Sequence, residues 1–384
     1  MNNFVYDNPV KIIFGKGTIK NISKEIPLGS RVLVTYGGGS IKKNGVYDQV
    51  SKALSDYEWF EFSGIEPNPH YETCMKVVSF IKEKSIDYVL AVGGGSVIDA
   101  TKFIVAAACF EDGDPWKILS ERVVIKKALP FGSVLTISAT GSEMNNGAVI
   151  TRAETQDKLA FGSPLTYPRF SVLDPEVTYS LPAKQIGNGV VDAFVHVAEQ
   201  YLTYFEGDSL LQDLQAEAIL KTLVIEGPKA LANPTDYDVR ANLMWASTWA
   251  LNGWIACGVP QDWATHMIGH EITAFYGIDH AQTLAIVLPG LLTVLKDQKS
   301  KKIKRIGSEV FGIKSSDDEL IEKSIKAIEN FFEKMGIKTH LSNYGLNDEA
   351  IAKVSDRLAE RGWKLGECQN ITSDMVKEIL QLRK

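Results

Sequence analysis

The sequence has few cysteines, and they do not form a zinc site or a disulfide framework. Four cysteines occur in 384 residues, and none of them belongs to a C-x-x-C pair. They are Cys74, Cys109, Cys257 and Cys368. Thiols so sparse and scattered are typical of a protein from a reducing compartment. We therefore expect a cytoplasmic protein.

A membrane-spanning run and an excess of positive charge are also missing. The best apolar candidate, residues 284–295, contains Pro289 and Gly290 and is too short to cross a bilayer. The N-terminal residues show no basic segment followed by an apolar stretch, so we expect no secretory signal. Lys and Arg number 41 against 47 Asp and Glu, a net charge of −6. This balance argues against a nucleic-acid partner.

Several common catalytic motifs do not occur. The chain has no G-x-G-x-x-G fingerprint, no G-x-x-x-x-G-K-[ST] loop and no G-x-S-x-G elbow. The order H-x-x-x-H-E, from His266 to Glu271, differs from the H-E-x-x-H of zinc proteases. The sequence therefore disfavours a hydrolase.

What remains is an average globular composition, 45% hydrophobic and 23% charged, with two kinds of patterning. In the first half, strand-like runs such as RVLVTY and YVLAV alternate with helical segments, which predicts parallel β/α units. Further strands are expected at 133–138 and 170–173, with a small hairpin at 148–150 and 158–161.

From residue 183 onward, only long amphipathic segments follow. We therefore predict an α/β fold, with a Rossmann-like parallel-sheet domain over 1–182 and an all-α domain over 183–384. The basic run at 296–305 is followed by acidic residues, so we interpret it as a solvated helix face without a function.

Three glycine-rich turns follow predicted strands. They are Gly37-Gly38-Gly39-Ser40, Gly93-Gly94-Gly95-Ser96 and Thr140-Gly141-Ser142. At such strand ends glycines let the backbone approach a phosphate, and helix N–H groups can bind it. Glycines also make ordinary tight turns, and the S-x-x-D spacing of Ser96 and Asp99 equally fits a helix-capping box. Taken together, the three turns favour a nucleotide site.

Four of the six histidines fall in two short windows, beside an aspartate. Asp192 and His196 are four residues apart, so on a helix they point from one face, as metal ligands must. His266 and His270 have the same spacing, and a turn at Gly277 can bring the next histidine back toward them. The expected ligands are Asp192, His196, His266 and His280.

One carboxylate and three imidazoles suit a divalent ion such as Fe²⁺ or Zn²⁺, with room for a substrate oxygen. The alternative is a set of hydrogen-bonded core histidines with a capping aspartate.

These residues resemble the iron-containing (group III) alcohol dehydrogenase family, most closely its NADPH-dependent butanol dehydrogenase and aldehyde reductase branch. The resemblance covers nearly the whole chain and rests on residues 93–102, on T-G-S-E at 140–143 and on the Asp192 and His266 motifs. It implies a dehydroquinate synthase-like architecture with cofactor and metal in a cleft between two domains. It also implies one Fe²⁺ per chain, with Zn²⁺ as the alternative.

The resemblance further implies roles for single residues. His270 would lie beside nicotinamide and substrate, where it could relay a proton or only position the substrate. The residues implied to bind NADP(H) are Gly37, Gly38, Gly39, Ser40, Asn68, Gly94, Gly95, Ser96, Asp99, Thr136, Thr140, Ser142 and Lys158.

The segment from Tyr36 to Lys43 contains no carboxylate, which predicts a preference for NADPH, because an acidic residue there would repel the 2′-phosphate. We expect reversible hydride transfer between NADP(H) and short- to medium-chain primary alcohols or aldehydes, performed by a homodimer. Four tryptophans, Trp245, Trp249, Trp254 and Trp263, would give the substrate an apolar lining or serve only as core. The alternatives are a glycerol-type polyol dehydrogenase, a sugar-phosphate lyase, or a noncatalytic metal-stabilised nucleotide-binding protein.

Overall fold

The computed structural model describes residues 1–384, except for the side chain of Asp318, and divides them into two compact units. The α/β unit contains residues 7–181 and 234–244, and the helical unit contains 1–6, 182–233 and 245–384. The predicted division into 1–182 and 183–384 is therefore incomplete. Two short segments, 1–6 and 234–244, and the boundary residue Pro182 belong to the unit opposite to the one predicted.

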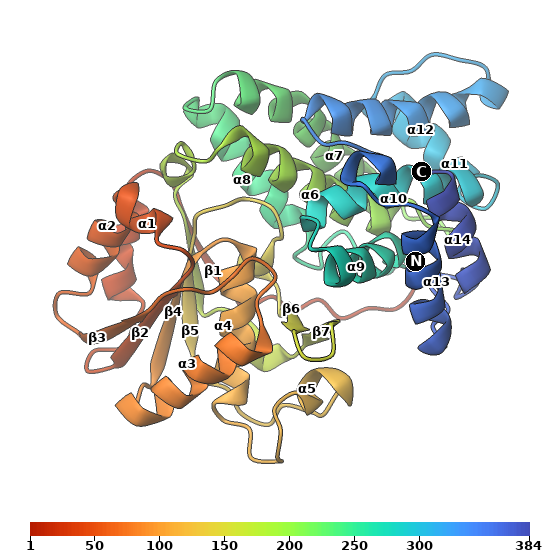
Figure 1. Ribbon diagram of the computed structural model, residues 1–384. Coiled ribbons are helices and arrows are strands. Elements are labelled where there is room, and N and C mark those ends of the chain that lie inside the picture. The colour runs from red at the N-terminus through yellow and green to blue at the C-terminus, as the bar shows by residue number, and fades with distance from the viewer. The chain divides into compact units, whose positions relative to one another are not determined.

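A six-stranded sheet, parallel throughout, forms the centre of the α/β unit (Figure 1). Its strands are β1 (Lys11–Phe14), β2 (Arg31–Tyr36), β3 (Glu58–Phe62), β4 (Tyr88–Gly93), β5 (Phe131–Leu135) and β8 (Phe170–Leu173). They lie in the order β1-β8-β5-β4-β2-β3, so β4 stands between β5 and β2. The carboxyl ends of β2, β4 and β5 therefore face the same edge of the sheet.

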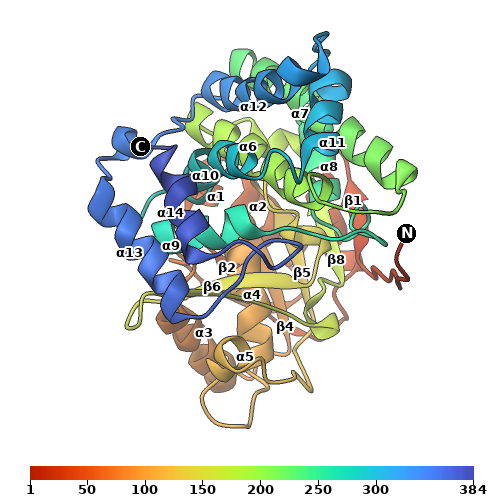
Figure 2. The ribbon, with the colours of Figure 1, turned by 90° about the vertical axis from the view of Figure 1, so that its right-hand side faces the viewer.

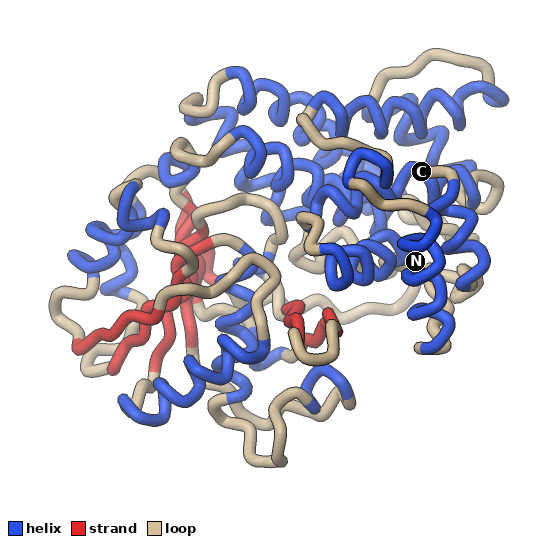
Figure 3. The backbone as a smooth tube through the Cα atoms, in the orientation of Figure 1, coloured by secondary structure: helices blue, strands red, loops and turns tan.

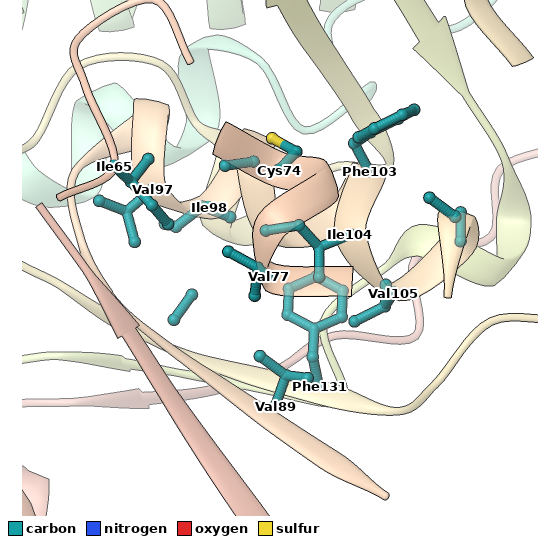
Figure 4. Close-up of a cluster of buried hydrophobic side chains, with 14 of the residues drawn as sticks. Ile65, Cys74, Val77, Val89, Val97, Ile98, Phe103, Ile104, Val105 and Phe131 are labelled. Atoms are coloured by element: carbon teal, nitrogen blue, oxygen red, sulfur yellow. The ribbon is translucent and has the colours of Figure 1, made fainter. Parts of the chain in front are cut away.

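Helices cover both faces of this sheet, because the strands carry apolar side chains on both sides. On one face, α3 (Tyr71–Lys84) and α4 (Gly95–Ala107) pack over residues such as Val89 and Phe131 (Figure 4). On the other face, α2 (Val46–Ala53) and the turn η1 (Thr18–Lys24) cover alternate residues such as Leu90. The predicted Rossmann-like parallel sheet is confirmed.

A separate antiparallel hairpin, β6 (Gly147–Arg152) and β7 (Asp157–Gly162), completes the α/β unit. The hairpin forms where it was predicted, with longer strands. The strand predicted at 133–138 instead spans Phe131–Leu135.

The named elements of the helical unit are helices and turns throughout its described residues, as Figure 3 shows. They include α6 (Ala183–Tyr201), α7 (Leu210–Ala232), α9 (Ala264–Tyr276), α10 (His280–Val294), α11 (Ser300–Arg305), α12 (Asp317–Lys334), α13 (Asp348–Glu360) and α14 (Ser373–Gln381). Helix α10 is apolar around most of its circumference and packs against α6, α9 and α14 (Figure 2). None of the described helices is both long and apolar enough to cross a membrane.

The basic run at 296–305 is only partly solvated. The side chain of Lys299 is fully buried, and that of Lys302 is nearly so. Arg305 pairs with Glu217 at 2.7 Å. The interpretation of this run was wrong because Lys299, Lys302 and Arg305 meet carboxylates that lie far away in the sequence.

Candidate metal centre and nucleotide loops

Helix α6 carries the first two candidate metal ligands on one face. Asp192 and His196 are one turn apart and are only 4% and 5% exposed. Oδ1 of Asp192 lies 3.9 Å from Nδ1 of His196. The i, i+4 spacing thus brings both side chains together inside the unit, as binding one metal ion would require.

Two further helices bring the other candidate histidines to the same place. His266 lies near the start of α9, which ends at Gly277 in the left-handed conformation, and His280 begins α10. The rings of His196 and His266 stack with centroids 4.6 Å apart. His280 Nε2 lies 3.6 Å from Asp192 Oδ1. Ligand atoms of Asp192, His196 and His266 lie within 4.8 Å of one another.

The residues present fit a divalent transition-metal ion. Burial lowers the pKa of His196 to about 4, opposed by the charge of Asp192, so its imidazole is neutral near neutral pH. Its buried Nδ1 makes no hydrogen bond to any described residue. A buried neutral imidazole beside a carboxylate is the donor set that Fe²⁺ and Zn²⁺ accept.

His270 lies one turn after His266 on α9 and is 7% exposed. Its ring centroid is 5.2 Å from that of His280 and 6.2 Å from that of His266. This places the predicted catalytic histidine next to two candidate ligands. Its role in proton transfer stays a prediction.

Sequence reasoning missed Glu199, which is 2% exposed and hydrogen-bonds with His266 Nδ1. Its pKa is raised by burial, whereas hydrogen bonds from the first turn of α9 act in the opposite direction. Glu199 follows Asp192 by seven residues, so it lies on the same face of α6 as both ligands. The helical spacing that pointed to Asp192 and His196 could have found it.

Among the four tryptophans, Trp263 approaches the metal site. Its ring centroid lies 5.3 Å from that of His266 and 6.2 Å from that of His196. The other three contact one another in a chain, with Trp249 between Trp245 and Trp254. An apolar lining for substrate therefore stays a prediction, now centred on Trp263.

In the α/β unit, the three glycine-rich turns lie at the carboxyl ends of β2, β4 and β5. Gly64 N–H donates to Gly37 O at 3.0 Å, and Thr136 N–H donates to Gly93 O at 3.0 Å. The turns are thereby tied to neighbouring strands. A β-carbon at Gly38 would have no protein atom within 4 Å, whereas one at Gly95 would collide with the Thr140 side chain.

Helix α4 begins at Gly95 with Gly94 as its N-cap, and no side chain caps it. The capping-box alternative for Ser96 and Asp99 is therefore wrong. Asp99 instead accepts hydrogen bonds from Ser142 Oγ at 2.5 Å and from Val149 N–H at 2.9 Å. It holds the third turn and β6 against α4, and its contact with a cofactor stays a prediction.

A fully buried lysine supports the same turn. Lys102 Nζ donates to Ser142 Oγ, Asn145 Oδ1 and Gly147 O at 2.7–2.8 Å. Burial lowers the pKa of Lys102 to about 8, although Asp99 opposes this shift.

The remaining predicted cofactor residues also lie in this unit. Lys158 Nζ donates to Asn68 Oδ1 at 2.8 Å, so these two residues form a pair. Thr140 Oγ1 accepts from Ser142 N–H at 3.2 Å, and Thr136 is buried beside β4. Their contacts with a nucleotide stay predictions.

A carboxylate does lie near the first glycine turn, although none occurs within it. Glu61 of β3 accepts from Lys42 Nζ at 3.1 Å, and this ammonium lies over the rings of Tyr36 and Tyr47. The segment 36–43 itself contains no carboxylate, but the neighbouring strand β3 places Glu61 beside it.

Two family models match the chain. The model described as iron-containing alcohol dehydrogenase matches residues 9–175. The model of the C-terminal part of the Fe-containing alcohol dehydrogenase family matches residues 187–383. The two matches cover nearly all of the described sequence.

Individual relatives align along their whole length. The chain is 54% identical over 385 residues to the NADPH-dependent aldehyde reductase YqhD of Escherichia coli, covering 99% of both chains. It is 40% identical over 388 residues to NADH-dependent butanol dehydrogenase A of Clostridium acetobutylicum, again covering 99% of both.

Solved structures are similar to the same extent. The crystal structure of E. coli YqhD superposes with a TM-score of 0.98 at 53% identity and covers 100% of this chain and 99% of that chain. The structure of NADH-dependent butanol dehydrogenase A from Thermotoga maritima gives 0.94 at 40% identity, with coverage of 100% and 99%.

Proposed function

Because the chain belongs to the iron-containing alcohol dehydrogenase family, we propose that it interconverts short- to medium-chain aldehydes and primary alcohols with NADP(H) and a divalent metal. The observation that carries the proposal is the buried group of Asp192, His196 and His266. The 54% identity to an NADPH-dependent aldehyde reductase supports the choice of reaction.

In the proposed mechanism, Asp192, His196, His266 and His280 hold the metal ion. When bound, the ion supplies a Lewis acid that polarises a carbonyl oxygen, an effect of several kcal/mol on the barrier. Aldehyde reduction needs a hydride at the carbonyl carbon, which NADPH supplies, and a proton at the oxygen. We propose that His270 relays this proton: one ring nitrogen accepts a proton from water while the other donates its own to the oxygen, because imidazole exchanges protons near pH 7.

The proposed nucleotide site consists of the three glycine turns. Gly94, Gly95 and Ser96 would hold the pyrophosphate, because α4 directs its first N–H groups toward that turn. Thr136, Thr140 and Ser142 would lie nearer the nicotinamide. We propose Fe²⁺ as the ion by family, with Zn²⁺ as the alternative, because both ions accept these ligands.

The direct test is NADPH oxidation on addition of butanal to protein loaded with Fe²⁺ or Zn²⁺. We expect turnover that requires the metal. A higher kcat/KM for glycerol or a phosphorylated polyol would favour the polyol dehydrogenase or lyase alternative. Nucleotide binding without any turnover would favour a noncatalytic role.

The role of His270 has its own test. His270→Ala should lower kcat and alter its pH profile while metal content stays unchanged. An unchanged rate and profile would exclude a proton relay by His270.

The preference for NADPH is proposed from the first glycine turn. Gly38→Asp should weaken the binding of NADPH at least about tenfold more than the binding of NADH, because a like charge would face the 2′-phosphate. The substitution fits the fold, since no protein atom lies within 4 Å of the added β-carbon. Equal or better kcat/KM with NADH in the unmodified enzyme would contradict the assignment of this turn.

A further inference from the structure

Glu199 connects the metal site to the beginning of helix α9. Its Oε2 hydrogen-bonds with His266 Nδ1, and its Oε1 accepts from Thr265 N–H at 2.6 Å. Both carboxylate oxygens therefore serve as acceptors for the first turn of α9. With Nδ1–H donating to Glu199, the imidazole presents its other nitrogen, Nε2, as the ligand atom.

Asp262 fixes the same helix start from the other side. Its Oδ1 accepts from Ala264 N–H at 2.9 Å, and its own N–H donates to Glu199 O at 2.8 Å. Trp263, which lies between these bonds, has a φ of 65°, a left-handed conformation that is uncommon for a bulky residue. The flanking hydrogen bonds hold this turn and so determine where α9, and His266 with it, begins.

The buried ammonium of Lys299 neutralises the carboxylate of Asp262. Its Nζ lies 2.8 Å from Asp262 Oδ2 and 2.8 Å from Glu367, and it donates to Leu202 O at 2.8 Å. The Lys299 side chain is 0% exposed. A buried ammonium with all its acceptors in place is a rigid anchor, because any displacement leaves a buried charge uncompensated.

We propose that Glu199 is a positioning residue of the metal centre and that Lys299, through Asp262, anchors it. Glu199 holds the His266 ring with Nε2 toward the ion, and the Lys299–Asp262 pair fixes the helix start that carries the ring. The inference rests on the proposed metal site. Partners of this kind behind a ligating histidine commonly contribute ten- to hundredfold to metal affinity.

Glu199→Gln tests the first part. The amide has the size of the carboxylate, but in the same orientation its NH₂ group faces one of the two donors that now bind separate oxygens, His266 Nδ1–H or Thr265 N–H. We expect the Zn²⁺ dissociation constant of metal-stripped, full-length protein to rise about ten- to hundredfold. It is measured by chelator competition well below the unfolding temperature, with Co²⁺ absorption bands as a second readout of ligand geometry.

A merely structural role would lower the Tm of the metal-free protein but leave the Zn²⁺ dissociation constant unchanged. Glu329→Gln is the matched control, because it makes the same chemical change at a buried glutamate whose partners are Lys326, Arg383 and Thr339. We expect this control to alter Zn²⁺ affinity less than about twofold. An equal loss of affinity in both variants, or no loss in Glu199→Gln, overturns the positioning role.

Asp262→Asn tests the anchor and remains available if Glu199→Gln does not fold. The asparagine can still accept from Ala264 N–H, but it presents an NH₂ group to Lys299. We expect Zn²⁺ affinity to fall at least about threefold. Unchanged affinity in Asp262→Asn overturns the role of Lys299. Failure of the unmodified protein to bind Zn²⁺ or Fe²⁺ would instead contradict the proposed metal site itself.

Discussion

The two units use different parts of the chain to make their candidate sites. In the helical unit, side chains from α6, α9 and α10 converge, and burial keeps the His196 imidazole neutral. In the α/β unit, the candidate site consists mainly of backbone at three strand ends, with glycine where a side chain would intrude. The helical site therefore depends on which side chains are present, whereas the loop site depends on glycines that have none.

The same contrast applies to the fully buried lysine of each unit. Lys102 donates to a hydroxyl, an amide and a backbone carbonyl, all of them neutral, and its pKa is lowered. Lys299 meets the carboxylates of Asp262 and Glu367. The direct acceptors of Lys102 carry no charge, so burial outweighs the charges of Asp99 and Glu143 and lowers its pKa. The buried Lys102 that supports the third glycine turn therefore lowers the free energy of unfolding near neutral pH.

The largest expected effect comes from removing a metal ligand, which should abolish activity but leave nucleotide binding unchanged. Asp192→Ala or His196→Ala should remove the metal and lower kcat/KM at least about a thousandfold, ~4 kcal/mol of barrier. NADPH binding, followed by fluorescence titration, should persist, because the glycine turns belong to the other unit. Elemental analysis gives the metal content. Full occupancy in both variants would contradict the ligand assignment.

The converse change should act on the loops. Gly95→Val places a side chain against Thr140, at the turn proposed to bind the pyrophosphate, so NADPH affinity should fall about a hundredfold. The metal content should not change. Gly38→Ala, whose methyl group meets no protein atom within 4 Å, is the control and should change affinity only about threefold. Similar losses in both variants would contradict a steric cause at Gly95.

The buried lysine of the loop site predicts a dependence of stability on pH. The pKa of Lys102 is lowered from 10.5 to about 8, so above pH 8 the folded state binds fewer protons than the unfolded state. Stability relative to a Lys102→Met variant should therefore rise with pH, by about 1.4 kcal/mol between pH 7 and pH 9. Urea unfolding of both proteins measures this difference. A constant difference across that range would show that Lys102 keeps its charge.

The smallest expected effect concerns Lys42 and Glu61, whose side chains are 44% and 38% exposed. Glu61→Gln should release Lys42 and remove a negative charge. The affinity for NADPH relative to that for NADH should therefore rise about two- to fivefold at low salt. Glu58→Gln, on the same strand but paired with Arg31, is the matched control. A shift of the same size in the control would assign the effect to net charge alone.

Much of this molecule follows from local sequence patterns. Alternating β/α segments predicted the parallel sheet, and i, i+4 spacing predicted that Asp192 and His196 would share one face of a helix. The turn at Gly277 brings His280 back, as its position in the sequence indicated. These features could be predicted because each depends on residues close together in the chain.

The features that escaped prediction depend on pairing across long stretches of sequence. The basic run around Lys299 predicts a solvated helix face, but its partners Asp262 and Glu367 lie 37 residues before it and 68 residues after it in the chain. Glu61 approaches the first glycine turn only because β3 pairs with β2. Periodicity and composition carry no information about such partners, which follow from the three-dimensional packing of the elements.

The chain passes between the two units after Tyr6, Leu181, Asn233 and Met244. Arg240, in the returning segment, bonds to Thr178 and so secures that segment within the α/β unit. Neither unit therefore corresponds to one uninterrupted stretch of gene. During translation the α/β unit stays incomplete until Met244 has left the ribosome. The helical unit stays incomplete until residues 245–384 have also been synthesised. A single recombination point cannot exchange either unit with a relative; a working chimera needs every one of these junctions.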